Sequence, residues 1–143
     1  MRERYFVYPA DLTAEPEGGM TVTFPDIPEA ITFGADHEDA IMQAEDALNT
    51  AVDEYLRRGL ALPEPSRVGK RQVAVPVDTV LALKAALQEA LGQSGLSKAA
   101  FARRLGTDAK EVQRLLDPRH ASKVRRMTEA LRSLGRSVAV AVS

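Results

Sequence analysis

The residues best suited to chemistry lie in the stretch 97–116, SKAAFARRLGTDAKEVQRLL. Its apolar residues recur at helical spacing on either side of Gly106, where a sharp turn needs a residue that tolerates positive φ. Ser97 precedes the first segment, and Thr107 or Asp108 precedes the second, as N-terminal caps. Two short helices about a tight glycine turn predict a helix-turn-helix, whose second helix enters the major groove of DNA.

The polar side chains of the predicted second helix supply the chemistry for reading bases. The amide of Gln113 is suited to adenine and the guanidinium of Arg114 to guanine, while Ala109 is suited to a thymine methyl. Lys98, at the start of the first helix, is expected to contact the DNA backbone. The predicted DNA-contacting residues are therefore Lys98, Ala109, Lys110, Gln113 and Arg114.

An ordinary helical hairpin with a solvated charged face is the alternative interpretation of this stretch. Glu111 departs from the DNA-binding pattern, because a carboxylate repels phosphate unless it points at a cytosine amine or away from the DNA. The other basic residues nearby are Arg103, Arg104, Arg119 and Lys123. Arg119 and Lys123 are explained equally well as phosphate contacts or as solvated charges. For Arg103 and Arg104 the interpretation as solvated charges is the stronger.

Composition sets the broad class of the protein. The 143 residues are 45% hydrophobic and 27% charged, as in a folded soluble chain of one medium or two small domains. The absence of cysteine excludes disulfides, thiolate metal sites and cysteine nucleophiles. No apolar run approaches the length that spans a membrane, and no signal peptide is recognisable, so a cytoplasmic location is expected.

The net charge of −1 conceals two halves of opposite sign. Residues 1–70 hold 14 Asp and Glu against 6 Lys and Arg, whereas residues 71–143 hold 13 Lys and Arg against 6 Asp and Glu. The basic half contains the predicted helix pair, which favours contact with phosphate. An acidic half joined to a basic half predicts two modules with oppositely charged partners.

The front of the chain predicts an α+β module. Short strands are expected over 5–8, 20–24 and 30–33, followed by a helix from Asp36 to Gly59 with one apolar face. The run QVAVPV at 72–77 is a further strand and a candidate fourth strand of the same sheet. Its Pro76 is compatible either with an edge strand or with the last turns of this strand. We therefore predict a three- to four-stranded antiparallel sheet with one helix over residues 1–77.

The rest of the chain, residues 78–143, predicts an all-α domain that carries the helix pair. A long helix begins after Asp78 and ends near Gly92, and a last helix is expected over 123–134. The run SVAVAV at 137–142 predicts a terminal strand, which either pairs with its copy in a second subunit or docks on its own domain. A homodimer is expected, because one helix pair buries little DNA surface.

Catalysis is not expected. Asp26, Asp36 and Asp39 are the nearest set of carboxylates for a metal-dependent nuclease, but the first is explained as a turn residue and the second as a helix cap. His37 and His120 are the only histidines, and they lie in different modules. These residues are too few for a histidine nuclease or a zinc site, so neither a metal nor a cofactor is predicted.

The order of motifs along the chain resembles the HicB antitoxin family in its helix-turn-helix form. Together their order and spacing are specific, and they cover nearly the whole chain. The matching features are Gly18–Gly19, Phe24–Pro25–Asp26, Pro28, Thr32 with Gly34, the capped acidic helix from Asp36 through Gly59, PEPS at Pro63–Ser66 and VPV at Val75–Val77.

This resemblance implies a partial RNase H-like fold for the first module, without catalytic activity, and a HicA-type toxin as its partner. Such a toxin is an mRNA-cleaving enzyme whose catalytic histidine the antitoxin covers, while the second module represses the operon of the pair by binding its operator. The candidate toxin-binding residues are Asp26, Glu29, Glu45, Asp46, Asp53 and Glu54. The alternative is a helix-turn-helix repressor whose first module binds a small ligand or an unrelated protein.

Overall fold

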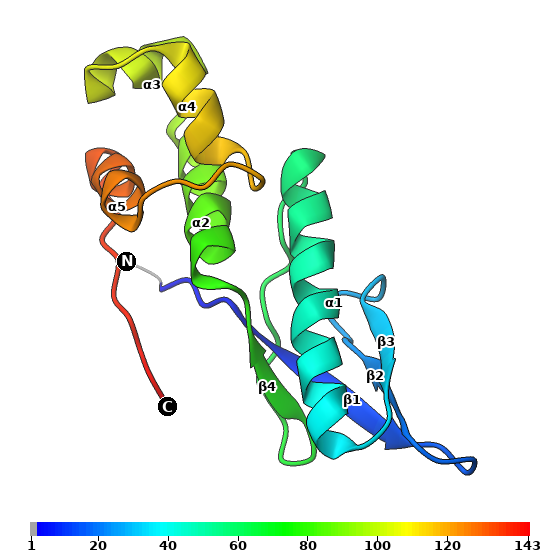
Figure 1. The fold of residues 1–143 in the computed structure, drawn as a ribbon. Coiled ribbons are helices and arrows are strands. Elements are labelled where there is room, and N and C mark those ends of the chain that lie inside the picture. The colour runs from blue at the N-terminus through cyan, green and yellow to red at the C-terminus, as the bar shows by residue number, and fades with distance from the viewer. Residues whose placement is uncertain (1–2) are drawn as a thin grey trace. The chain divides into compact units, whose positions relative to one another are not determined.

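The computed structural model describes residues 3–143 and has an α+β fold. The chain divides into two compact units, which Figure 1 shows as a sheet with one helix and a group of shorter helices. The N-terminal unit comprises the residues up to Tyr55 together with Leu62–Asp78, and the C-terminal unit comprises Leu56–Ala61 together with Thr79–Ser143.

The N-terminal unit is built on a four-stranded antiparallel sheet. Its strands are β1 (Val7–Ala14), β2 (Met20–Thr23), β3 (Ile31–Gly34) and β4 (Val73–Pro76), and their spatial order is β3-β2-β1-β4. The prediction that the run containing Pro76 forms an edge strand of this sheet is confirmed. The sheet therefore has four strands, the upper end of the predicted range.

The first strand is longer than the expected segment 5–8, because its two halves pair with different neighbours. Residues 7–10 pair with β4, and residues 11–14 pair with β2. Pro9 lies in the half of β1 that pairs with β4 and that β2 does not flank. The N–H that proline lacks is therefore not needed for a hydrogen bond to β2. A proline is thus accommodated inside a strand that lies second from the edge.

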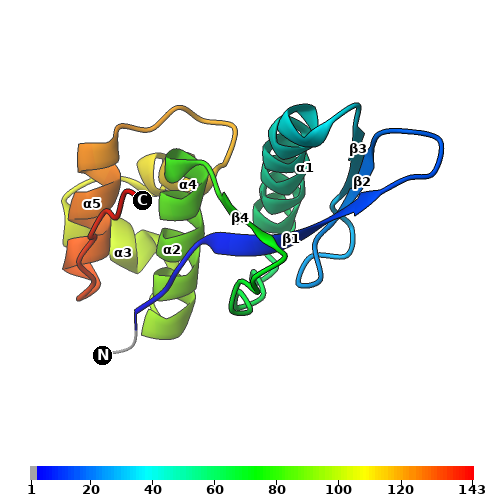
Figure 2. The same ribbon diagram turned by 90° about the horizontal axis from the view of Figure 1, so that it is seen from below.

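Helix α1 (His37–Arg57) packs on one face of this sheet (Figures 1 and 2). The apolar face of α1 and the inward face of the sheet form the core of the unit, where Gly34 of β3 lies directly against Ala40. A Cβ atom at Gly34 would lie 2.3 Å from the backbone of Ala40. The fully buried residues of this core include Tyr8, Ala10, Val22, Ala44, Leu48 and Val52.

The segment that follows α1 is tied back to the sheet by side chains of the N-terminal unit. The Tyr8 hydroxyl donates to the Pro63 carbonyl oxygen at 2.6 Å. The two carboxylate oxygens of Asp26 accept from the backbone N–H of Ser66 at 2.8 Å and from its hydroxyl at 2.5 Å. These contacts lead the chain from the end of α1 to β4.

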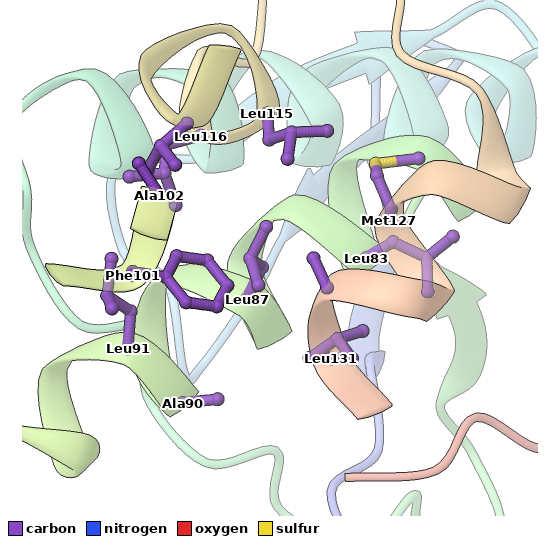
Figure 3. Close-up of a cluster of buried hydrophobic side chains, with 12 residues drawn as sticks. Leu83, Leu87, Ala90, Leu91, Phe101, Ala102, Leu115, Leu116, Met127 and Leu131 are labelled. Atoms are coloured by element: carbon purple, nitrogen blue, oxygen red, sulfur yellow. The ribbon is translucent and has the colours of Figure 1, made fainter. Parts of the chain in front are cut away.

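The C-terminal unit consists of four helices packed around one apolar cluster. They are α2 (Thr79–Ser94), α3 (Lys98–Leu105), α4 (Ala109–Leu116) and α5 (Val124–Ser133). Figure 3 shows side chains from all four helices pointing toward a common centre. The residues at this centre include Leu87 of α2, Phe101 of α3, Leu115 of α4 and Met127 of α5, all essentially inaccessible to solvent.

Helices α3 and α4 meet at the predicted glycine turn. Gly106 ends α3 in the left-handed conformation, with φ of 70°, and its N–H donates to carbonyl oxygens of the last turn. The Ser97 hydroxyl accepts from Ala100 N–H at 3.0 Å, and the Asp108 carboxylate accepts from Glu111 N–H at 2.8 Å. Thr107 and Asp108 are the two candidates for the cap of the second helix, and Asp108 is the N-cap of α4.

The predicted strand over 137–142 does not form on its own domain, and its pairing with a copy in a second subunit stays a prediction. In the described chain this segment follows α5 without regular structure, as the red tube in Figure 1 shows. Alternating valines form a strand only beside another strand that accepts and donates the backbone hydrogen bonds. The elements of the C-terminal unit are all helices among the described residues, so Val140 and Val142 are left 80% and 92% exposed.

Candidate functional site

The predicted DNA-contacting residues lie at the start of α3 and along one side of α4. Lys98, Ala109, Lys110, Gln113 and Arg114 are all exposed. The opposite side of α4 is buried in the core through Val112, Leu115 and Leu116. The helix therefore presents two cations and one amide to solvent from a rigidly packed base.

A hydrogen bond joins two of these residues across the two helices. Lys98 Nζ donates to Gln113 Oε1 at 2.6 Å. Because this oxygen is the acceptor, the amide nitrogen of Gln113 is directed away from Lys98 and keeps its two donors for a ligand. The lysine thus orients the amide, a role the sequence prediction, which gave Lys98 a backbone contact, did not include.

Glu111, the residue that departs from the DNA-binding pattern, lies between two arginines. Its carboxylate is 3.6 Å from Arg114 Nη1 and 3.9 Å from Arg126 Nε. Both pairs are partly exposed, so each contributes little to stability. Their effect here is on the surface potential, because the carboxylate faces two cations of its own unit and its repulsion of an incoming phosphate is reduced.

Lys84 of α2 is the residue of this region that the sequence analysis missed. Its side chain is fully buried, and Nζ donates to the carbonyl oxygens of Arg114 at 3.0 Å and Leu115 at 3.1 Å, and to the Ser122 hydroxyl at 2.8 Å. Burial lowers the pKa of Lys84, against the opposing influence of Asp117 and Glu111. The signal in the sequence is a lysine placed between Leu83 and Leu87 on an apolar helix face.

The remaining basic candidates also lie at the surface of the C-terminal unit. Arg103, Arg104, Arg119 and Lys123 are all exposed. Arg104 Nη1 donates to the Ser133 carbonyl oxygen at the end of α5, at 3.4 Å. This contact links the end of α3 to the end of α5, and the choice between phosphate contact and solvated charge stays a prediction for all four residues.

The six acidic residues predicted to bind a toxin fall into two groups. Asp26 and Glu29 lie in the loop between β2 and β3 and make internal contacts: Asp26 holds Ser66, and both oxygens of Glu29 accept from the Tyr55 hydroxyl at 3.0 Å. The other four lie on α1, where Glu45 and Asp46 are exposed and Asp53 and Glu54 are half-buried.

The residues considered for catalysis lie in loops or at the start of α1. Asp36 Oδ1 accepts from Asp39 N–H at 2.8 Å, and Asp39 Oδ2 accepts from Ala35 N–H at 2.7 Å, so both carboxylates serve the start of α1. Across residues 3–143, no group of three or more His, Asp or Glu side chains is arranged to hold a metal ion. Nor does any helix in that range have the length and apolar character to span a membrane.

The two units carry opposite charges. The N-terminal unit has 15 Asp and Glu against 5 Lys and Arg, and the C-terminal unit has 14 Lys and Arg against 5 Asp and Glu. The division by compact units is therefore sharper than the division of the sequence at residue 70. Through long-range electrostatic forces, each unit favours partners whose charge is opposite to its own.

A family profile matches most of the N-terminal unit. The profile of a family described as "HicB_like antitoxin of bacterial toxin-antitoxin system" matches residues 7–86, more than half of the chain. The chain belongs to this HicB-like antitoxin family. The matched range includes the whole sheet, α1 and the first half of α2, and it ends before α3 and α4.

Curated members of the family extend the similarity through the C-terminal unit. Antitoxin HicB of Escherichia coli K12 is 37% identical over 133 residues, which cover 93% of this chain and 96% of that protein. Antitoxin HicB 2 of Photorhabdus laumondii is 41% identical over 120 residues, 84% of this chain and 85% of its own length. Antitoxin HicB of Pseudomonas fluorescens is 34% identical over 138 residues, 96% and 94% of the two chains.

Proposed function

We propose that this HicB-like antitoxin neutralises a HicA-type mRNA-cleaving toxin with its N-terminal unit and represses its own operon with its C-terminal unit. In this proposal the N-terminal unit is a non-catalytic partial RNase H-like fold that covers the active site of the toxin. Helices α3 and α4 act as a helix-turn-helix, and the chain works as a homodimer or higher homo-oligomer in the cytoplasm. The observation that carries the proposal is the opposite charge of the two units.

The acidic unit suits a partner that handles RNA. An enzyme that binds a polyanion is expected to present a basic surface, and an acidic protein surface attracts it and competes with phosphate. Family membership supplies the class of partner, because HicB-like proteins are antitoxins of bacterial toxin–antitoxin systems. The acidic candidates on α1 that face solvent, Glu45 and Asp46, belong to this attraction.

The basic unit suits DNA. Specific readout by a helix-turn-helix needs a recognition helix that is held rigidly from behind and carries donors on its outward side. Helix α4 has both properties, since its apolar side is buried and its outward side carries Gln113 and Arg114. A single such helix contacts few base pairs, so two copies on one operator are expected.

The proposal is tested with the full chain and the protein encoded beside it in the genome, produced with its catalytic histidine substituted so that it is not toxic. We expect the two proteins to co-purify, and we expect the chain to shift the mobility of DNA from its own promoter in preference to unrelated DNA. If the neighbouring protein is not retained, the antitoxin assignment to this partner fails. If promoter and unrelated DNA compete equally, the operator assignment fails.

A further inference from the structure

The face of the sheet that points away from α1 carries an apolar patch at its β3 edge. Ile31 and Phe33 are 64% and 53% exposed, although both are large hydrophobic residues. They lie two residues apart on an edge strand, so their side chains point to the same face. That face is the outward one, because Gly34, which points the opposite way from Phe33, lies against Ala40 of α1.

The neighbouring strand continues this patch with hydroxyl groups. In the register of β2 and β3, Thr21 lies opposite Phe33 and Thr23 lies opposite Ile31. Directly opposite residues of an antiparallel pair share one face, so the outward surface here is formed by two threonines and two large apolar side chains. We call these four residues, Thr21, Thr23, Ile31 and Phe33, the outer patch.

Carboxylates border the outer patch at the turn between β1 and β2. Glu15 Oε1 accepts from the Thr21 hydroxyl at 2.7 Å, which holds this carboxylate next to the cross-strand partner of Phe33. The Phe33 ring in turn lies across Gly19, where a Cβ atom would be 2.1 Å from Phe33 Cζ. A hollow in the surface at this point is lined by Glu15, Pro16, Glu17, Gly18 and Phe33.

The charged residues around the outer patch are all acidic. Residues 11–34, which supply the end of β1, both strands of the patch and the connecting turns, contain five Asp and Glu and no Lys, Arg or His. Two copies of the chain that joined through this face would bring like charges together, which is unfavourable. A partner with a cationic surface gains from the same carboxylates, and a Lys or Arg side chain is attracted to both an aromatic ring face and a carboxylate.

We infer that the outer patch is the surface on which the toxin docks, with a cationic side chain of the toxin entering the hollow between Phe33, Glu15 and Glu17. This inference rests on the proposed function, and it adds the location of the contact. It also assigns the main contact to residues outside the six acidic candidates, whose charges then act in attraction at longer range. Exposed apolar side chains surrounded by polar groups are typical of protein–protein contact surfaces.

The test measures the affinity of full-length variants for the inactive toxin by isothermal titration calorimetry. We expect Ile31→Lys to weaken toxin binding by about tenfold or more, as for a residue at the centre of an interface. Met42→Lys is the matched control, because Met42 on α1 is 63% exposed and the substitution adds the same charge. The control is expected to change toxin affinity by less than about threefold.

The charged part of the inference is tested with Glu17→Gln, which retains the shape of the side chain. At low salt, we expect this variant to bind the toxin more weakly than the unaltered chain does. As salt is raised, we expect the variant to lose less affinity than the unaltered chain. Phe33→Ser is a second test of the patch, and circular dichroism with thermal unfolding of each variant reports whether the N-terminal unit, to which these residues belong, is folded. If Phe33→Ser fails to fold, Ile31→Lys and Glu17→Gln decide the question.

The outcomes separate this inference from the proposed function. Absence of toxin binding by the unaltered chain would overturn the proposed function itself. If the unaltered chain binds the toxin and neither Ile31→Lys nor Glu17→Gln changes the affinity, only the placement on the outer patch is overturned. A change of oligomeric mass by light scattering in Ile31→Lys, with toxin affinity intact, would assign the patch to a second copy of the chain and would also overturn the inference.

Discussion

Lys84 and Leu115 are joined inside the C-terminal unit by a hydrogen bond of 3.1 Å from the ammonium group to the carbonyl oxygen. The same group donates to Arg114 O and to the Ser122 hydroxyl, so all three of its protons are used. The last carbonyl groups of a helix have no partner within the helix, and a cation there is also favoured by the helix dipole. Lys84 therefore fixes the end of α4 from behind, while the outward side of α4 stays exposed.

Replacement of this lysine is expected to weaken the C-terminal unit. Lys84→Met keeps the apolar stem but removes the donor from two helix-end carbonyls and a hydroxyl, and we expect the free energy of unfolding to fall by about 2 kcal/mol. Urea denaturation measures the change. Lys98→Met, at an exposed position, is the control and should change stability by less than about 0.5 kcal/mol. Equal effects of the two substitutions would contradict the role given to Lys84.

The pH dependence of stability offers a separate test of the same group. Burial lowers the pKa of Lys84 from its ordinary value of 10.5, so between the lowered value and 10.5 the unfolded chain binds more protons than the folded chain. Stability contributed by this group therefore rises with pH across that window. We expect the difference in unfolding free energy between the unaltered chain and Lys84→Met to widen as the pH approaches 10.5. A difference that narrows would mean that the pKa is shifted the other way.

The outward side of α4 is expected to carry the specificity for DNA. Gln113→Ala and Arg114→Ala should each weaken promoter binding by about 1–3 kcal/mol, because each removes a side chain suited to paired hydrogen bonds with a base. Binding of the inactive toxin, measured in parallel, should stay unchanged. Loss of both activities would indicate misfolding, and unchanged promoter affinity would refute the assignment of α4 as the recognition helix.

The contact between β3 and α1 predicts a strong steric effect at one glycine. Gly34→Ala should destabilise the N-terminal unit by about 1–3 kcal/mol, because the added methyl group would lie 2.3 Å from the backbone of Ala40. Gly92→Ala in α2 is the control, since a Cβ built there has no atom within 4 Å apart from its chain neighbours and the backbone of its own helix. That change should stabilise the helix by about 0.5–1 kcal/mol. If the Gly34→Ala chain unfolds at a higher temperature than the Gly92→Ala chain, α1 can shift at Ala40 with little cost in free energy.

The sequence predicted the local elements well where periodicity and caps agree. The glycine turn at Gly106, the cap at Ser97 and the edge strand at Pro76 follow from backbone preferences of single residues, and the structure has all three. The helices behind them follow from apolar spacing. These features depend on neighbours along the chain, which is why they are visible without a structure.

The features that the sequence did not predict depend on distant parts of the chain. The extension of β1 past Pro9 depends on which strand flanks each half of it, and the absence of a strand over 137–142 depends on the lack of a neighbouring strand. The role of Lys84 depends on the position of the end of α4, thirty residues later. The contact residues for DNA and toxin remain predictions, because they depend on partners.

We propose that the two units bind different partners, the N-terminal unit a toxin and the C-terminal unit DNA. The most direct test is amide hydrogen exchange on the full chain, alone, with the inactive toxin and with promoter DNA. We predict that the toxin slows exchange in β2, β3 and the turn before them, and that DNA slows exchange in α3 and α4. Protection of α3 and α4 by the toxin, or of β2 and β3 by DNA, would contradict the account.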